Sequence, residues 1–354
     1  MKTYKNLFDS IVSFENLLLA AIKAQKAKRF RDNVACFNMN LERNLLQLQD
    51  DLRDQNYQPG EYDSFYIYQP KKRLISAAPY RDRVVHHALC NLIEPFFERS
   101  FIFDSYANQK GKGTHRAVTR FQKYLCQYKY VLKCDIKKYF PSIDHKILKE
   151  NIRKKIADQK TLWLIDTIID NSNPQEKINV YFPGDDLFTP WERRRGLPIG
   201  NLTSQFFANV YLNDFDHFVK EKLRCKAYQR YVDDFVMLDN DKMRLKEMGK
   251  AANEFLMGLR LSIHPKKYQI FLNNQGIDFL GYLVFPTHIR LRKSNALRFR
   301  RRFKKMAEKY RAGKIKLENV NPSVQSWLGH ACFANTYNLR RSIFSQIKFQ
   351  KNEG

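Results

Sequence analysis

The run Tyr228-Gln-Arg-Tyr-Val-Asp-Asp-Phe-Val-Met-Leu238 constrains the fold of this chain more than any other stretch. It is rich in aromatic and β-branched residues, and two adjacent acids, Asp233 and Asp234, interrupt it before the apolar pattern resumes. This pattern predicts a β-hairpin with an acidic turn, because Asp tolerates turn conformations and the flanking residues favour strands. Two carboxylates at one tip repel each other, which raises a pKa or recruits a cation. Oxygen ligands of this kind suit Mg²⁺; a solvent-exposed Asp-Asp turn without chemistry is the simpler alternative for this stretch alone.

The net charge of the chain indicates which class of binding partner is favoured. Its 354 residues contain 63 Lys and Arg against 36 Asp and Glu, a formal net charge of +27. Such a surplus favours a polyanion, and nucleic acid is a better candidate than a membrane because we find no long apolar span and no lipidation signal. The N-terminus lacks the apolar core of a signal peptide, and the six cysteines form no C-x-x-C pair. We therefore expect a cytoplasmic protein without a zinc site or a disulfide framework.

Helices and further strands are expected on both sides of the hairpin. Apolar residues at helical spacing predict helices over 8–22, 41–52, 79–94, 117–125, 241–259 and 298–311, and a helical ending over 322–344. Strands are expected at 65–68, after the basic turn at 70–76, at 128–135, and in a hairpin at 276–284. Pro95 should follow the end of the 79–94 helix, and Thr203 or Ser204 should cap another helix that runs toward Phe218. Residues 171–190 are the least regular stretch and predict a variable loop or small hairpin.

Two basic loops contain glycine. In the loop 105–116, glycines allow close approach to a phosphate chain and several cations supply charge, although an ordinary solvated loop is the alternative. The loop 193–205 precedes a helix, whose N-terminus can present backbone N–H groups to a nucleotide. This second signal is weak as a pattern, since it is not a phosphate-binding loop of the G-x-x-x-x-G-K-[ST] kind.

A third acid, Asp135, ends the strand expected at 128–135. It lies 98 residues (233 − 135) before Asp233, and the three acids would converge if their strands neighbour each other in one sheet. A lone Asp at a strand end is often only a turn residue. Three carboxylates beside basic loops, however, are what two-metal phosphoryl transfer requires.

The order of motifs along the chain resembles that of reverse transcriptases. The motifs are a basic Arg-Leu-Ile strand, Ser-Tyr-x-x-x-x-Gly-x-Gly, Asp-x-x-x-x-Phe, Gly-Leu-Pro-x-Gly, Tyr-x-Asp-Asp, Pro-Lys-Lys and Phe-Leu-Gly-Tyr, and they cover about residues 60–290. Within that superfamily, Ile199-Gly-Asn-Leu-Thr-Ser-Gln205 resembles the variant motif of reverse transcriptases from diversity-generating retroelements. Group II intron and retroviral enzymes instead place a Gln directly after Leu-Pro or Thr-Pro. Because Ile199 is aliphatic where relatives have a hydrogen-bonding Gln, we hypothesise relaxed base selection.

The resemblance implies a role for each matched position. Asp135, Asp233 and Asp234, with the backbone carbonyl of Ile136, would bind two Mg²⁺ ions, for which Mn²⁺ is a substitute. Phe140 would exclude a ribose 2′-hydroxyl, although a core aromatic is its alternative role. The other nucleotide-binding positions would be Arg73, Lys71, Lys72, Leu197, Pro198, Ile199, Gly200, Gln205 and Lys267 or its neighbour Lys266. Template and primer would contact Lys110, Lys112, Arg116, Tyr231, Leu280, Gly281, Tyr282, Arg298, Arg301, Arg302 and Lys305.

The fold implied by the resemblance is an α+β right-hand polymerase. It would have an N-terminal helical extension at 1–58, fingers at 59–127, an antiparallel, ferredoxin-like palm at 128–288 with an insertion at about 146–195, and a basic helical thumb at 289–354. The implied function is RNA-directed DNA synthesis from a template-repeat RNA with adenine-directed errors. The implied partners are template RNA, an RNA or DNA primer, dNTPs and a pentameric accessory variability determinant protein, with no membrane partner. The alternatives are a phage-defence or other prokaryotic reverse transcriptase, and a non-catalytic nucleic-acid-binding protein on a polymerase scaffold. A group II intron maturase is disfavoured by the Thr-Ser-Gln motif and by the lack of room for extra domains.

Overall fold

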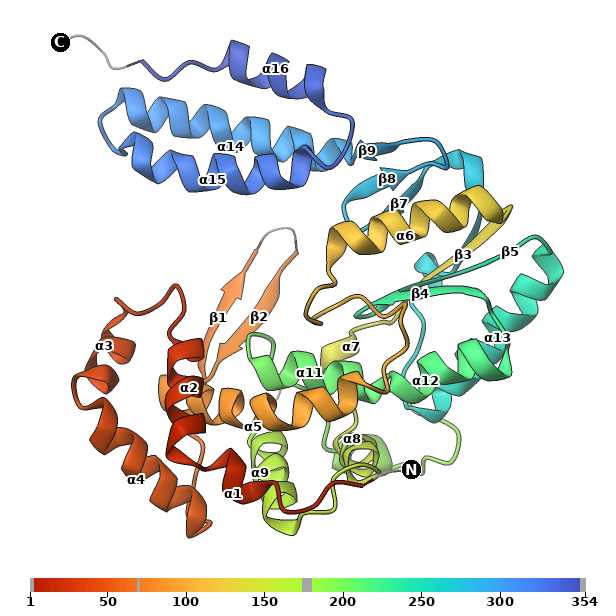
Figure 1. The fold of residues 1–354 in the computed structure, drawn as a ribbon. Helices are drawn as coiled ribbons and strands as arrows, with labels where there is room; N and C mark the ends of the chain where they lie inside the picture. The colour runs from red at the N-terminus through yellow and green to blue at the C-terminus, as the bar shows by residue number, and fades with distance from the viewer. Residues whose placement is uncertain (1–2, 69–70, 174–179, 351–354) are drawn as a thin grey trace.

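The site-bearing part of the fold is a four-stranded antiparallel sheet in the order β4-β5-β3-β6, which we call the central sheet. Figure 1 labels β3, β4 and β5. The computed structural model describes residues 3–68, 71–173 and 180–350. The sheet consists of β3 (Tyr130–Asp135), β4 (Ala227–Tyr231), β5 (Asp234–Asp239) and β6 (Gln269–Leu272). The expected acidic hairpin is confirmed, because β4 and β5 are antiparallel neighbours joined by a turn of two residues, Val232 and Asp233.

Each face of this sheet packs against a different layer. Alternate residues of a strand point to opposite faces, so Phe235 and Met237 join one hydrophobic core while Val236 and Leu238 join the other. The first core includes α5 (Tyr80–Glu98), α8 (His145–Arg153), α9 (Gln159–Asp170), α11 (Leu202–Tyr211), α12 (Asn213–His217) and α13 (Lys242–Gly258). The second includes α6 (Thr114–Gln127) and a three-stranded sheet of β7 (Ile277–Phe279), β8 (Tyr282–Val284) and β9 (Ile289–Leu291).

Helical groups lie at the two ends of the molecule (Figure 1). The N-terminal group comprises α1 (Phe8–Ile11), α2 (Phe14–Ala24), α3 (Asp32–Met39) and α4 (Leu41–Arg53), and the C-terminal group comprises α14 (Lys293–Arg311), α15 (Leu317–Ala331) and α16 (Tyr337–Gln346). In the C-terminal group, the ring of Phe299 stacks on Trp327 with their centroids 3.9 Å apart. The remaining elements are the hairpin β1 (Asp63–Ile67) and β2 (Arg73–Ala77), α7 (Tyr139–Ser142), α10 (Thr189–Glu192), a π-helical turn (Phe218–Lys222) and 3₁₀ turns at Pro265–Lys267 and Asn273–Gln275. No helix in the described ranges has the length and apolar character needed to cross a membrane.

Several expected boundaries were wrong. The 8–22 helix is two helices, because Ser13 is extended and its hydroxyl accepts a hydrogen bond from the Asn16 amide at the start of α2. Pro95 lies inside α5, which continues to Glu98, where the packing of Phe97 against Phe206 of α11 favours one more turn. The residue preceding α11 is Asn201, so neither Thr203 nor Ser204 is its N-cap.

The ending at 322–344 is helical as expected, and its first helix starts earlier, at Leu317. It is two helices, α15 and α16, and the Thr336 hydroxyl donates to the Ala331 carbonyl at the end of the first. Helix α3 was not predicted at all. Part of the irregular stretch 171–190, residues 174–179, and Pro70 of the basic turn lie outside the described residues.

Candidate functional site

Strand pairing brings the three acids together at one end of the central sheet. Strands β3 and β5 are antiparallel neighbours, and Asp135 stands directly opposite Asp234 in their register. Asp233 occupies the turn before β5, and its carbonyl accepts a hydrogen bond of 3.0 Å from the Ile136 amide. The convergence expected from the sequence is therefore confirmed.

Two of the three carboxyl groups, Asp233 and Asp234, have raised pKa values. Burial raises the pKa of Asp233, and the nearby Asp135 raises it further, while the charges of Lys267 and Arg73 act in the opposite direction. Burial also raises the pKa of Asp234 to about 7; Lys133 opposes this shift, and Asp233 and Asp135 add to it. Crowded, desolvated carboxylates of this kind are typical of functional sites.

The donor set fits a hard divalent cation. Asp135, Asp233 and Asp234 offer only oxygen ligands, which is the preference of Mg²⁺, and positive charge there would relieve their repulsion. Across the described ranges, no three His, Cys, Asp or Glu side chains already enclose a point for a metal ion. Instead, Asp135 and Asp234 share a hydrogen bond, and the Lys267 ammonium group pairs with Asp135. Lys267 was expected at the nucleotide. Its neighbour Lys266, the alternative expected there, is exposed.

The hairpin β1–β2 supplies cations near the acids. Arg73, Lys71 and Lys72 are exposed at the start of β2 or just before it, and the Lys72 ammonium lies 4.4 Å from the centroid of the Tyr66 ring. Among these three, Arg73 is the one whose charge acts on Asp233. In this placement the exposed Arg73 guanidinium lies near the acids, where it would meet a phosphate group bound to cations that the acids hold.

The loop before α11 pairs with the free edge of β2. The Ser76 amide donates to the Ile199 carbonyl over 2.9 Å, and the Asn201 side chain bonds both the Ser76 carbonyl (2.9 Å) and the Ala78 amide (3.0 Å). Gly200 has φ +126°, and a Cβ atom there would lie 3.1 Å from Ile75. Only a residue without a side chain fits this approach unstrained. The loop and the strand thus form one unit.

The other expected nucleotide positions differ in accessibility. Phe140 is half-buried, and its carbonyl accepts from the Leu197 amide over 3.0 Å. Leu197 and Pro198 are buried, so their side chains serve packing, whereas Ile199 is half-buried and Gln205 is exposed. Lys138, two residues before Phe140, has φ +48° and precedes the short helix α7.

The basic loop 105–116 uses part of its charge to hold its own backbone. The Lys112 ammonium donates to the carbonyls of Phe103 and Ser105, each over 2.8 Å, and the Arg116 guanidinium donates to the Gly111 carbonyl. Lys110 is exposed. The Tyr231 hydroxyl lies 3.2 Å from Thr114. Of the three cations of this loop expected to contact template and primer, Lys110 and Arg116 are exposed, and Lys112 is half-buried.

The β7–β8 turn is anchored by a histidine pair. Leu280 and Gly281 are half-buried at the turn, but Tyr282 is fully buried. Its hydroxyl lies 3.0 Å from His115 of α6 and 2.7 Å from Nδ1 of His330 of α15. Tyr282 therefore holds the turn between two helices and offers no exposed side chain to a primer. The four cations expected on the basic helix, Arg298, Arg301, Arg302 and Lys305, are all exposed on α14.

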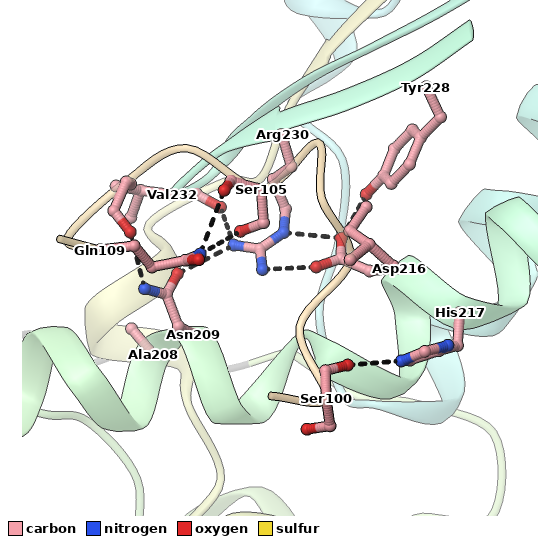
Figure 2. A network of polar contacts seen from close by, with 12 residues as sticks. Ser100, Ser105, Gln109, Ala208, Asn209, Asp216, His217, Tyr228, Arg230 and Val232 are labelled. Atoms are coloured by element: carbon pink, nitrogen blue, oxygen red, sulfur yellow. Dashed lines mark hydrogen bonds and ion pairs between the residues drawn. The ribbon is translucent and has the colours of Figure 1, made fainter. Parts of the chain in front are cut away.

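Sequence reasoning missed the polar residues that support this site. Arg230 and Asp216 form a fully buried ion pair beneath the acidic turn (Figure 2). The signal was present, because strand alternation places Arg230 on the same face as Tyr228, which points into an apolar core. Asn201 and His330 gave no comparable signal, since their partners are distant in the sequence.

Comparisons with known proteins agree with this geometry. Residues 64–284 match the family described as Reverse transcriptase (RNA-dependent DNA polymerase). Protein YkfC of Escherichia coli is 26% identical over 275 residues, which cover 66% of this chain and 69% of that protein. The group II intron-encoded protein LtrA of Lactococcus lactis is 25% identical over 203 residues, 55% of this chain and 32% of LtrA, so the chain spans about a third of that relative.

A solved telomerase from Candida Tropicalis superposes with a TM-score of 0.47 and 11% identity, covering 87% of this chain and 64% of that one. The family match spans the acidic hairpin, β3, the β1–β2 hairpin and the β7–β8 turn, and it agrees with a right-hand polymerase fold. With its three acids converged on one sheet end, this chain belongs to the reverse transcriptase (RNA-dependent DNA polymerase) family.

Proposed function

We propose that the protein synthesises DNA on an RNA template at the Asp135–Asp233–Asp234 site. The observation that carries this proposal is the register of β3 and β5, which puts Asp135 opposite Asp234 with Asp233 in the adjoining turn. Two Mg²⁺ ions held by these carboxylates and the Ile136 carbonyl would activate the primer 3′-hydroxyl and neutralise the leaving pyrophosphate. The chain's own residues position the reactants around that centre.

Each of the surrounding elements contributes to positioning. Arg73 would reach the triphosphate, and a planar guanidinium suits that task because it binds phosphate oxygens in a fork. Phe140 would form the floor beneath the sugar and exclude a 2′-hydroxyl. Lys267 pairs with Asp135 in the free protein and is released to an anionic substrate when the acids bind cations. The exposed cations of α14 would grip the phosphates of the template–primer duplex.

In the proposed polymerase these elements form a hand. The fingers would comprise 59–127, the palm 128–288 and the thumb 289–354, with residues 1–58 as an extension. The insertion in the palm would span about 146–195. The position of the α14–α16 group at one end of the molecule supports the boundary proposed for the thumb (Figure 1).

Primer extension on an RNA template tests the proposal. Asp233→Asn and Asp234→Asn should each abolish Mg²⁺-dependent DNA synthesis while RNA binding is retained, because an amide is a poor ligand for the cation. Asp239→Asn, at the opposite end of β5, is the matched control and should keep activity. Full synthesis by either of the first two variants would contradict the assignment.

We further propose that the enzyme serves a diversity-generating retroelement and copies template adenines with frequent errors. The support is the segment Ile199–Gln205, in which Ile199 offers an aliphatic side chain beside β2 where a hydrogen-bonding residue would read the base pair. Sequencing of the products should show errors concentrated at adenines. Ile199→Gln should reduce them, and Ile199→Leu, which stays aliphatic, should not. An unchanged error spectrum in Ile199→Gln would refute the role of this residue.

The retroelement proposal includes two macromolecular partners. They are a structured RNA that carries the template repeat and a pentameric accessory variability determinant protein. Extension assays with and without each partner test this, since the proposal expects product only or mainly when both are present. Efficient, accurate synthesis without them would instead favour a general prokaryotic reverse transcriptase, the second candidate, which the similarity to YkfC and LtrA supports.

A further inference from the structure

Arg230 is a charged residue with no access to solvent, one strand position from Tyr231 of the Tyr-x-Asp-Asp motif. Its Nε and Nη2 atoms donate to the two carboxylate oxygens of Asp216 over 2.7 and 2.6 Å, and the Tyr228 hydroxyl donates to the same carboxylate over 2.6 Å. All three side chains are completely buried (Figure 2). Burial lowers the pKa of Arg230, but Asp216 raises it more, so the guanidinium stays charged.

The remaining nitrogen of this guanidinium points at the catalytic turn. Nη1 donates to the Val232 carbonyl over 2.9 Å and lies 3.3 Å from Oδ1 of Asn209 (Figure 2). Val232 is the first of the two residues that connect β4 to β5, directly before Asp233. The hydrogen bond therefore holds the peptide group between Val232 and Asp233, and the orientation of this peptide group affects the position of the Asp233 carboxylate.

The conformation of Val232 explains why such a hold is needed. Its φ is +57°, in the left-handed region, where a β-branched side chain is strained. Two-residue hairpin turns with a positive φ at the first connecting residue normally place glycine there. The Ile136 amide also holds the turn, through the Asp233 carbonyl, but the bond from Arg230 acts on Val232 itself. Without that bond we expect the strained turn to relax and to move Asp233 and Asp234 relative to Asp135.

The same residue also ties the basic loop to the sheet. The Arg230 amide donates to the Asp104 carbonyl and its own carbonyl accepts from the Tyr106 amide, both over 3.0 Å. Asn209 adds a second link, because its Nδ2 donates to the Ala107 carbonyl over 2.9 Å. Arg230 thus lies where three elements meet: the loop that starts at Asp104, the helices that carry Asn209 and Asp216, and the catalytic hairpin.

We propose that Arg230 is a positioning residue that stabilises the turn at Val232, where φ is positive, by donating a hydrogen bond from Nη1 to the Val232 carbonyl. Asp216 holds the guanidinium in the orientation that this bond requires. We call this interaction the brace. This inference rests on the proposed polymerase function for its effect on the reaction rate. A buried ion pair by itself is weak evidence of stabilisation, since apolar residues of similar size often replace one without loss. Arg230 differs from an ordinary buried ion pair because it makes a further hydrogen bond outside the pair, from Nη1 to the Val232 carbonyl in the turn.

Two sets of variants remove the brace without leaving a buried charge alone. Arg230→Lys keeps a cation beside Asp216 but loses the planar fork that reaches Val232. The triple variant Arg230→Met, Asp216→Leu and Tyr228→Phe replaces the whole buried network by apolar groups. Both should fold, as judged by thermal unfolding. Both should lower kcat about tenfold or more while the KM for the primer–template stays within about twofold, because the lost interaction acts on the turn carboxylates and not on binding.

The decisive measurement combines these variants with Val232→Gly. Glycine adopts a positive φ without strain, so a turn that contains it needs no brace. In the Val232→Gly background, each brace variant should therefore lower log kcat by at most about a third of the amount by which it lowers log kcat in the wild-type background, a coupling that a double-mutant cycle measures. An equal loss of kcat with and without Val232→Gly would overturn the proposal, as would wild-type kcat in both brace variants.

Amide hydrogen exchange of residues 231–236 separates this proposal from the polymerase assignment. The brace variants should exchange these amides faster than wild type, and Val232→Gly should make the exchange rates of braced and unbraced proteins similar. If the wild-type protein lacked RNA-templated synthesis, and the variants still differed from it in amide exchange as described, the polymerase proposal would fail and the brace would stand. Unchanged exchange in both brace variants would contradict the brace whatever the activity.

Discussion

Asn201→Ala should detach the edge of β2 from the loop before α11. The Asn201 side chain is 1% exposed and bonds the Ser76 carbonyl and the Ala78 amide, both of which belong to buried residues. Removing the amide leaves these two backbone groups without that partner, at about 1–3 kcal/mol each. We therefore expect a loss of about 2–6 kcal/mol in the free energy of unfolding, a large share of the roughly 5–15 kcal/mol typical of a folded protein.

The same substitution should affect nucleotide binding more than chemistry, because Arg73 lies at the other end of β2 and none of the three acids contacts Asn201. Urea unfolding and hydrogen exchange of residues 73–78 measure the structural effect, and the KM for dNTPs in primer extension measures the functional one. Asn33→Ala, at an exposed position of α3, is the control and should change stability by less than about 0.5 kcal/mol. A loss below about 1 kcal/mol for Asn201→Ala, with an unchanged KM, would refute the reasoning.

Three further predictions concern other parts of the molecule. Gly281→Ala should destabilise the protein more than Gly313→Ala. Both glycines have a positive φ, but of the two only Gly281 has neighbours that a Cβ atom would meet, Asn295 at 3.1 Å and His330 at 3.3 Å. Thermal unfolding compares the two variants, and equal decreases in Tm would contradict the packing argument. Burial, with smaller contributions from His87 and Arg83, lowers the pKa of His86 to about 3, so the unfolded chain binds a proton that the folded protein does not as pH falls below about 6.5. Wild type should therefore lose about 2 kcal/mol more than His86→Leu between pH 7 and pH 5, and parallel pH profiles in urea unfolding would oppose this. Replacing Arg298, Arg301, Arg302 and Lys305 by Gln should reduce the slope of log K for RNA–DNA binding against log salt by about 3.6, whereas removing the equal charge of Lys26, Lys28, Arg29 and Arg31 should not. Equal changes would indicate an effect of net charge alone.

The catalytic part of the site was predictable because its signals are local. The alternation of Tyr228–Leu238, broken by two acids, predicts a hairpin from neighbouring residues only, and Asp135 at a strand end supplies the third acid. Helix boundaries were less predictable where tertiary contacts override local preference, as at Pro95, where α5 continues through a residue that normally ends a helix. The N-cap of α11 was missed for a similar reason, because Asn201 is selected by its bonds to β2 and not by a capping bond.

The sequence by itself determined the acids, the basic helix and the order of motifs, because strand and helix periodicity are properties of consecutive residues. The tertiary structure alone decided which cations remain open to a substrate. Lys112 is bound to carbonyls of its own loop, and Lys267 is paired with Asp135, which lies 132 residues away in the sequence. Tyr282 is likewise enclosed by His115 and His330, both distant in the sequence. It also decided the role of Arg230. Asp216 of α12 orients the guanidinium, and in this orientation Nη1 donates a hydrogen bond to the strained turn.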